Sequence, residues 1–251
     1  MHEAAKGFAR EAQAYARGRP EYPVALDHWL RDVLKLDETR TVLDLGAGTG
    51  KFTRRLLATG ANIIAIEPVE EMLAQLMRAV PTVAARSGTA EKIPVNNAAV
   101  DAVVCAQSFH WFASKAALAE ICRVLKPGGI LGLVWNVRDE SVDWSAAITR
   151  IIAPFEGSAP RYRSGEWRKV FPAEGFGPLR QREFPNGHTG PAEQVIVDRI
   201  LSVSFIAALE RPQQHIVAAR LRDLIATNPA LRDRDEVTVP YKTVVFSCEK
   251  R

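Results

Sequence analysis

The sequence predicts an α/β protein built around a mostly parallel sheet. Strand-like apolar runs alternate with helix-like amphipathic stretches along much of the chain. Such alternation is typical of parallel sheets, whose neighbouring strands are joined by helical crossovers. The length of 251 residues suits one domain of the larger α/β type. A third indication is the strand-like run Val42–Leu45, which leads directly into a glycine-rich turn.

The first elements are predicted from apolar spacing. Residues 3–16 and 24–36 are expected to be two helices that precede the sheet. In the second helix the apolar side chains recur at helical spacing: Val24, Trp29, Leu30, Val33 and Leu34. Thr41–Leu45 is the first predicted strand. A helix over residues 50–58 follows it, and Gly60 ends that helix.

The central part of the chain continues the alternation. Asn62–Ile66 is the second predicted strand, and Pro68 can open the next helix because its missing N–H is not needed there. That helix has an apolar face: Met72, Leu73, Leu76, Met77 and Val80. Val100–Ala106 and Ile130–Trp135 are predicted as central strands, with a helix over residues 114–125 between them.

Beyond residue 138 the pattern loosens, because glycines and prolines interrupt residues 157–178. Four later elements are still expected: a strand over Leu179–Phe184, helices over residues 191–209 and 212–227, and a terminal strand over Val237–Cys248. Periodicity predicts that these elements exist, but not where they lie.

The turn Gly46–Gly50 carries the strongest functional information. It has glycine at alternate positions between a buried strand and a helix. Glycine permits a tight turn and lets a ligand approach where a Cβ would collide. A strand, a glycine turn and a helix start together form a cradle for a nucleotide.

The spacing of this turn argues against two common nucleotide motifs. A dinucleotide fingerprint would need glycine where Lys51 stands. A phosphate-binding P-loop would need glycine in place of Leu45 and Ser or Thr in place of Phe52. Asp44 would repel a pyrophosphate but suits a ligand with an ammonium group. Glu67 ends the second strand, roughly twenty residues onward, where an acidic side chain meets ribose hydroxyls.

Four sequence blocks occur in order between about residues 41 and 135: Asp44–Gly50, Ser87–Pro94, Val100–Gln107 and Leu125–Leu131. In order and spacing they resemble the glycine motif, the adenine-contacting segment, the fourth strand and the turn into the fifth strand of class I S-adenosylmethionine (SAM) dependent methyltransferases, of the methyltransferase type 11 kind. The resemblance implies a Rossmann-like seven-stranded sheet with an antiparallel last strand, helices on both faces and a helical cap insertion.

The same resemblance implies one methyltransferase domain over residues 1–251. Its expected segments are N-terminal helices (1–37), a SAM-binding core (38–138), a cap or substrate region (139–235) and a terminal strand (236–251). Substrate choice is expected to reside in the cap.

The family's cofactor contacts carry over onto particular residues. The turn residues Gly46, Ala47, Gly48, Thr49 and Gly50 would hold the methionine and ribose of SAM, Asp44 its ammonium group and Glu67 both ribose hydroxyls. Pro68 and Met72 would pack on the adenine, Thr89, Ala90 and Glu91 would meet its edge, and Gln107 would face the methyl group. Many relatives have Asp where Thr89 stands, so the adenine amino contact lies either with Glu91 or with backbone groups.

Simpler structural roles compete with several of these assignments. The glycines could form only a tight turn, and Glu67 could be a solvated strand end. Met72 could serve the core as well as the adenine, and Gln107 could cap the following helix.

An aromatic run around His110 is the next candidate for chemistry. The segment Phe109–Phe112 follows a central strand, where open α/β sheets bind ligands. His110 is the predicted proton acceptor for a hydroxyl or amine substrate; the alternative is a packed, hydrogen-bonded histidine. The run resembles trans-aconitate methyltransferase-like enzymes, as do Tyr15 and the segment Arg19–Pro23. By that resemblance Tyr15 and Arg19 would close over the SAM carboxylate and the active site; the alternative is a rigid linker.

Composition favours a cytoplasmic enzyme with a small-molecule acceptor. No apolar run is long enough to cross a bilayer, and the N-terminus lacks the layout of a secretion signal. Three widely spaced cysteines predict reduced thiols, with neither a metal site nor disulfides. The net charge of +4 is scattered, whereas nucleic-acid binding favours a basic stripe. Oligomeric state and acceptor stay open, although the basic cluster 161–169 could meet a carboxylate.

The predicted function is therefore transfer of the SAM methyl group to O, N or C of a small molecule by in-line displacement. Two alternatives belong to other classes. One is a SAM-binding regulatory protein without catalysis. The other is a nicotinamide oxidoreductase, which Lys51 and Asp44 disfavour.

Overall fold

The computed structural model describes residues 19–251, and the chain divides into two compact units. The sheet unit comprises Tyr22–Trp135, Pro160–Phe184 and Thr243–Arg251. The helical unit comprises the described residues up to Glu21, together with Asn136–Ala159 and Pro185–Lys242. This division places residues 160–184 with the sheet unit, although they lie inside the segment expected to form the cap. The single-domain organisation stays a prediction.

Seven strands form one sheet in the order β3-β2-β1-β4-β5-β7-β6. Their bounds are β1 Thr41–Leu45, β2 Asn62–Ile66, β3 Ala84–Arg86, β4 Val100–Ala106, β5 Leu125–Arg138, β6 Arg180–Gly190 and β7 Val237–Glu249. The pairs β1–β2, β1–β4, β2–β3 and β4–β5 are parallel, and antiparallel strands complete the C-terminal end of the sheet. The predicted Rossmann-like fold is confirmed. Strand β5 and the edge strand β6 run longer than expected, and the short β3 was not predicted.

The order of the strands reverses beside β1. The chain proceeds from β1 through β2 to β3 on one side, and then returns to β4 on the other side of β1. Open α/β sheets bind ligands at such a reversal, outside the carboxyl ends of the strands. Asp44 lies near that end of β1, paired with Ala65 of β2 and Val104 of β4. Glu67 directly follows β2.

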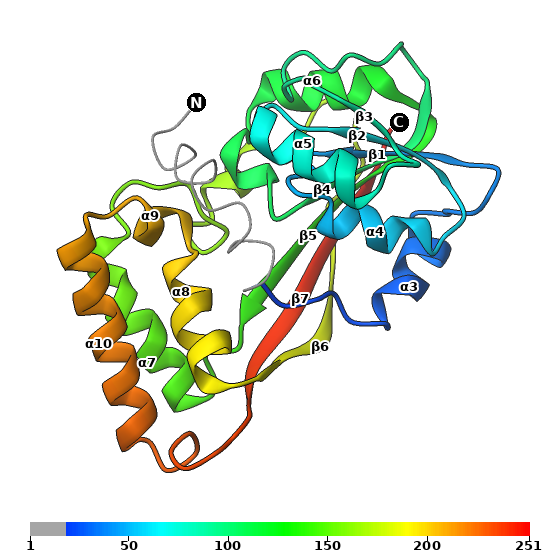
Figure 1. The fold of residues 1–251 in the computed structure, drawn as a ribbon. Helices are drawn as coiled ribbons and strands as arrows, with labels where there is room; N and C mark the ends of the chain where they lie inside the picture. The colour runs from blue at the N-terminus through cyan, green and yellow to red at the C-terminus, as the bar shows by residue number, and fades with distance from the viewer. Residues whose placement is uncertain (1–18) are drawn as a thin grey trace. The chain divides into compact units, whose positions relative to one another are not determined.

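Helices cover both faces of the sheet unit (Figure 1). They are α3 Leu26–His28, continued by the π-helical turn η1 Trp29–Val33, α4 Lys51–Leu57, α5 Glu70–Ala79 and α6 Lys115–Val124, with the 3-10 turns η2 Phe109–Trp111 and η4 Glu166–Val170. Trp29, Phe52 and Val42 belong to one buried core between α3, η1, α4 and the sheet. The connection from β4 to β5 advances in the opposite direction from that between β1 and β2, so right-handed crossovers place α6 on the opposite face.

Two details of the predicted helix after β2 are wrong. Pro68 does not open it, because α5 begins at Glu70 and the N–H of Val69 donates to the Glu67 carboxylate. Met77 does not join its buried face and is 54% exposed. Met72, Leu76 and Val80 are buried at four-residue intervals, and Met77 lies about 100° round the helix from Leu76.

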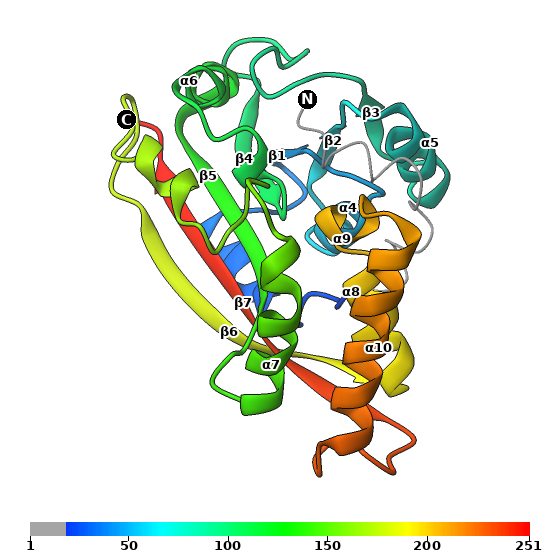
Figure 2. The same cartoon turned by 90° about the vertical axis from the view of Figure 1, so that its left-hand side faces the viewer.

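The helical unit, whose helices are seen in Figure 2, has its own apolar core. Its helices are α7 Asp143–Ile152, η3 Ala153–Phe155, the π-helical η5 Glu193–Asp198, α8 Arg199–Leu201, α9 Ser204–Ala207 and α10 Arg211–Thr227. Helix α10 packs beside α7 and α8. The predicted helix over 212–227 is confirmed, whereas that over 191–209 is divided into three pieces. Helix α7 was missed. Residues 3–16, expected to form a helix, lie outside the described residues.

Within residues 19–251, every helix is too short or too polar to cross a membrane.

Candidate functional site

The three glycines of the turn after β1 share a left-handed backbone conformation but differ in the space around them. Gly46, Gly48 and Gly50 have φ of +71°, +59° and +84°, in the left-handed region that favours glycine. A Cβ on Gly46 would lie 2.7 Å from the Cβ of Ser108, and one on Gly50 would lie 3.2 Å from Cγ of Leu76. A Cβ on Gly48 would meet nothing within 4 Å. Packing therefore closes the turn on two sides and leaves open space over Gly48.

Backbone hydrogen bonds hold this turn in place. The N–H groups of Gly46 and Ala47 both donate to the Ile66 carbonyl, at 2.8 and 3.1 Å. The Ser108 hydroxyl donates to the Leu45 carbonyl at 2.8 Å. These bonds tie the ends of β1, β2 and β4 together, so the cradle is formed before any ligand arrives.

Glu67 is a buried carboxylate oriented by two backbone donors. It is 5% exposed, and its Oε2 accepts from the Gly48 N–H at 2.8 Å. Its Oε1 accepts from the Val69 N–H at 3.0 Å. Burial raises the pKa of Glu67, and the two backbone bonds oppose that rise. Each carboxylate oxygen has two lone pairs, so both can accept a further hydroxyl donor. This geometry fits the ribose role predicted for Glu67.

Asp44 is fully buried and only half satisfied. Its Oδ2 accepts from the Thr53 hydroxyl at 2.7 Å, while its Oδ1 is buried with no hydrogen-bond partner in the described part of the chain. Burial raises the pKa of Asp44 to about 7; the Thr53 bond lowers it, and the nearby charge of Glu67 raises it. A buried polar atom without a partner is costly unless a ligand supplies the missing donor. An ammonium group, which carries three donors and a positive charge, fits this atom.

The segment after β4 borders the glycine turn. Gln107 has φ of +57°, a strained conformation for a residue that is not glycine, and its N–H donates to the Val134 carbonyl at 2.8 Å. Such outliers gather at functional sites. Ser108 follows it and limits the space beside Gly46. The structure therefore brings Gln107 to the same edge of the sheet as Asp44 and Glu67.

His110 is held by the indole of Trp135. The Trp135 Nε1 lies 3.1 Å from His110 Nδ1, and an indole N–H can only donate. Nδ1 must therefore carry a lone pair, and the neutral ring has its proton on Nε2. His110 is half-buried beside the rings of Trp111 and Trp135. His110 thus makes a hydrogen bond of the kind that the structural alternative expects, and its role in catalysis stays a prediction.

The predicted adenine contacts lie in two segments. Met72 is buried in α5, while Pro68, just before that helix, is exposed. Ala90 is buried between exposed Thr89 and Glu91, in a tight turn where the Lys92 N–H donates to the Thr89 carbonyl. The structure does not join these two segments by any hydrogen bond between described residues. Their contacts with adenine remain predictions.

The two N-terminal catalytic candidates have different standing. Tyr15 lies outside the described residues. Arg19 is described and belongs to the helical unit. The roles of both residues at the active site remain predictions.

Three residues of the site were missed by sequence reasoning: Thr53, Ser108 and Trp135. Thr53 lies in the helix that follows the glycine turn, and its polar side chain on that helix's buried face was a detectable signal. Ser108 and Trp135 act through long-range contacts that no local pattern indicates.

Comparison with known proteins agrees with this geometry. A family model described as a methyltransferase domain matches residues 43–133. An uncharacterized methyltransferase-like protein of Schizosaccharomyces pombe is 41% identical over 246 residues, covering 98% of this chain and 96% of the relative.

Solved structures share the fold at lower identity. A protein of Anaeromyxobacter dehalogenans, provisionally named a type II methyltransferase, has a TM-score of 0.66 at 23% identity, covering 93% of this chain and 97% of its own. Geranyl diphosphate C-methyltransferase of Streptomyces coelicolor, solved with S-adenosyl-L-homocysteine, has a TM-score of 0.52 at 15% identity, covering 90% and 79%.

Proposed function

This chain belongs to the SAM-dependent methyltransferase family, and from that premise we propose that it transfers the methyl group of SAM to a small-molecule acceptor. The acceptor atom is O, N or C, and the transfer is an in-line displacement. One observation supports the cofactor site most strongly. A buried, unpartnered carboxylate oxygen of Asp44 lies near the carboxyl end of the central strand, where a ligand's cation would complete its hydrogen bonding.

The residues present fit SAM. Asp44 would hold the ammonium group, Glu67 would accept from the ribose hydroxyls, and the open space over Gly48 would admit the ligand against the backbone. SAM supplies a sulfonium methyl group that is already activated for transfer. The main task of the protein is therefore to align the acceptor with that methyl group, and positioning alone can contribute roughly 7 to 11 kcal/mol to lowering the barrier.

We propose that His110 positions the acceptor as a hydrogen-bond donor. Its Nδ1 accepts from the Trp135 indole N–H, so the proton of the neutral ring is on Nε2, and this nitrogen can donate but not accept. Acting as a base at Nε2 would require the other tautomer, whose Nδ1–H would oppose the Trp135 N–H. This tautomer favours a role in holding an acceptor oxygen over the proton-acceptor role predicted from the sequence.

We propose that the helical unit supplies the choice of acceptor. The four sequence blocks from Asp44–Gly50 to Leu125–Leu131 lie in the sheet unit, and the roles predicted for them account for the cofactor. No sequence block in Asn136–Ala159 or Pro185–Lys242 matches the family's cofactor motifs. The helical unit overlaps the cap expected over residues 139–235, except for residues 160–184, which belong to the sheet unit.

The test combines binding with turnover. Isothermal titration of the full chain with SAM and with S-adenosylhomocysteine should show saturable binding at one site. Radiolabelled SAM incubated with a panel of small carboxylic acids, alcohols and amines should give a labelled product. Affinity for NAD with none for SAM would overturn the assignment. Tight SAM binding without turnover across the panel would favour the non-catalytic alternative.

A further inference from the structure

Arg199 is a buried cation for which the described residues supply no matching anion. It opens α8 in the helical unit and is only 9% exposed. Its Nε and Nη1 are buried and have no hydrogen-bond partner in the described part of the chain. Its backbone carbonyl accepts from the Ser202 hydroxyl at 2.8 Å, but that bond does not involve the guanidinium group.

The acids closest along the chain are engaged elsewhere. Asp198 precedes Arg199, yet its pKa is raised by burial and by Glu193 and lowered by Arg222, with no contribution from Arg199. Glu193 itself forms an ion pair with Arg222. The carboxylates of this stretch therefore serve Arg222 rather than Arg199.

An arginine cannot avoid the cost of burying an unpaired charge by losing its proton. A buried lysine or histidine can become neutral, whereas the guanidinium group stays charged in proteins. Arg199 also lies among apolar neighbours, because Val195, Ile196 and Ile200 are all part of the helical unit's core. A charge buried there without compensation weakens the fold unless something else binds it.

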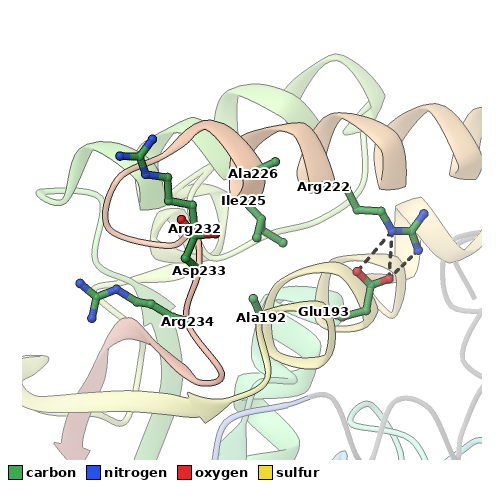
Figure 3. Close-up of a pocket in the computed structure, with 8 residues that line it drawn as sticks. All are labelled: Ala192, Glu193, Arg222, Ile225, Ala226, Arg232, Asp233 and Arg234. Carbon is green, nitrogen blue, oxygen red and sulfur yellow. Dashed lines mark hydrogen bonds and ion pairs between the residues drawn. The ribbon is translucent and has the colours of Figure 1, made fainter.

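Three other arginines of the same unit differ from Arg199 because they are exposed to solvent (Figure 3). Arg222, Arg232 and Arg234 line a hollow of about 450 Å³, and all three are exposed. Water solvates exposed guanidinium groups, and Arg222 has its partner in Glu193. These residues need no ligand to satisfy them, so they serve as matched controls for Arg199.

We propose that Arg199 binds the carboxylate of a small molecule in the helical unit. Guanidinium and carboxylate groups match in planar, two-pronged geometry. One buried cation balances the single charge of one carboxylate group, whereas phosphate concentrates nearly two negative charges on one centre and would leave a buried charge uncompensated. The site does not depend on the proposed function.

Thermal unfolding and titration calorimetry of the full chain without SAM test the site. The probes are succinate, its neutral analogue succinamide and inorganic phosphate, all at matched ionic strength. Succinate should raise the melting temperature of the wild type, succinamide should not, and phosphate should raise it less. Arg199→Met should lose this response, with at least a tenfold loss of succinate affinity. Arg232→Met should keep it.

The variants also separate folding from binding. Without ligand, Arg199→Met should have a melting temperature no lower than that of the wild type. Methionine has a side chain of similar length, and the substitution removes a buried, unpaired charge. Arg199→Lys keeps the cation and should retain part of the succinate response. An equal response to succinate in wild type and Arg199→Met, or an equal response to succinate and succinamide, would overturn the proposal. A larger response to phosphate would overturn the carboxylate class.

Failure of the proposed methyltransferase function can be distinguished from failure of the Arg199 site. Binding of S-adenosylhomocysteine is measured in the same preparations. Its absence from the wild type would remove the methyltransferase proposal while leaving the succinate result intact. Loss of the succinate response with unchanged S-adenosylhomocysteine binding in Arg199→Met would support both.

Discussion

Asp44 in the sheet unit and Arg199 in the helical unit are both buried charged residues, and each has side-chain atoms without a hydrogen-bond partner among the described residues. Asp44 lies two residues before a turn whose three left-handed glycines are visible in the sequence. Arg199 stands in an apolar helical stretch with no motif around it. A buried charged group without a partner indicates a ligand in both units, but only in the sheet unit does a sequence motif accompany it.

The two groups also differ in how they tolerate the absence of a ligand. Asp44 has a pKa raised to about 7, so it can take up a proton and become neutral. An arginine guanidinium group does not lose its proton in proteins. Cofactor binding in the sheet unit is therefore expected to respond to pH in the neutral range, whereas anion binding at Arg199 is not.

The largest expected effect is a loss of cofactor affinity in the sheet unit. Glu67→Ala should weaken binding of S-adenosylhomocysteine by at least tenfold, because it removes a charged acceptor for two hydroxyl groups. Glu71→Ala is the matched control, since Glu71 is an exposed acid at the start of the neighbouring helix α5. Titration calorimetry measures both. Unchanged affinity in Glu67→Ala with normal circular dichroism would remove Glu67 from the site.

The next effect is the pH dependence of cofactor binding. A cation needs the ionised carboxylate of Asp44, so affinity for S-adenosylhomocysteine should fall as the pH drops below about 7. With one proton linked, the fall approaches tenfold per pH unit. Asp44→Asn should bind more weakly and show a much flatter profile, with a residual slope from Glu67, whose pKa is also raised. A flat wild-type profile between pH 5.5 and 8 would contradict a role for Asp44 at the ammonium group.

The stability of the ligand-free protein should change in the opposite direction. The pKa of Asp44 is raised on folding, so its contribution to stability is complete below its ordinary pKa of 3.8 and is lost as the pH rises through about 7. Asp44→Asn, which cannot ionise, should therefore gain stability relative to the wild type between pH 5 and 8. Urea unfolding at several pH values measures this difference.

A smaller effect concerns the histidine beside the site. In the wild type, nitrogen-15 NMR should show neutral His110 with its proton on Nε2. Trp135→Phe removes the indole donor, so the other tautomer should appear. The rate of methyl transfer should change several-fold with little change in cofactor affinity. Observation of an Nδ1-protonated ring in the wild type would refute the donor role proposed for His110.

Much of the sheet unit was predictable because its constraints are local. Thr41–Leu45, Asn62–Ile66 and Val100–Ala106 were predicted with the bounds that the structure has. Their apolar runs are buried on both faces, and the glycine turn needs backbone angles that only glycine adopts readily. The helix after β2 was less well predicted, because the Glu67 carboxylate binds the Val69 N–H and delays its start.

The sequence by itself determined the fold class, the glycine cradle and the acidic residues proposed to flank the cofactor, since each depends on neighbours within a few positions or on the spacing of whole elements. Only the tertiary structure decided which buried groups lack partners. The unsatisfied oxygen of Asp44, the bond from Trp135 to His110 and the isolation of Arg199 all depend on residues distant in the chain. Burial and pairing are properties of packing, and packing brings together positions that no local pattern connects.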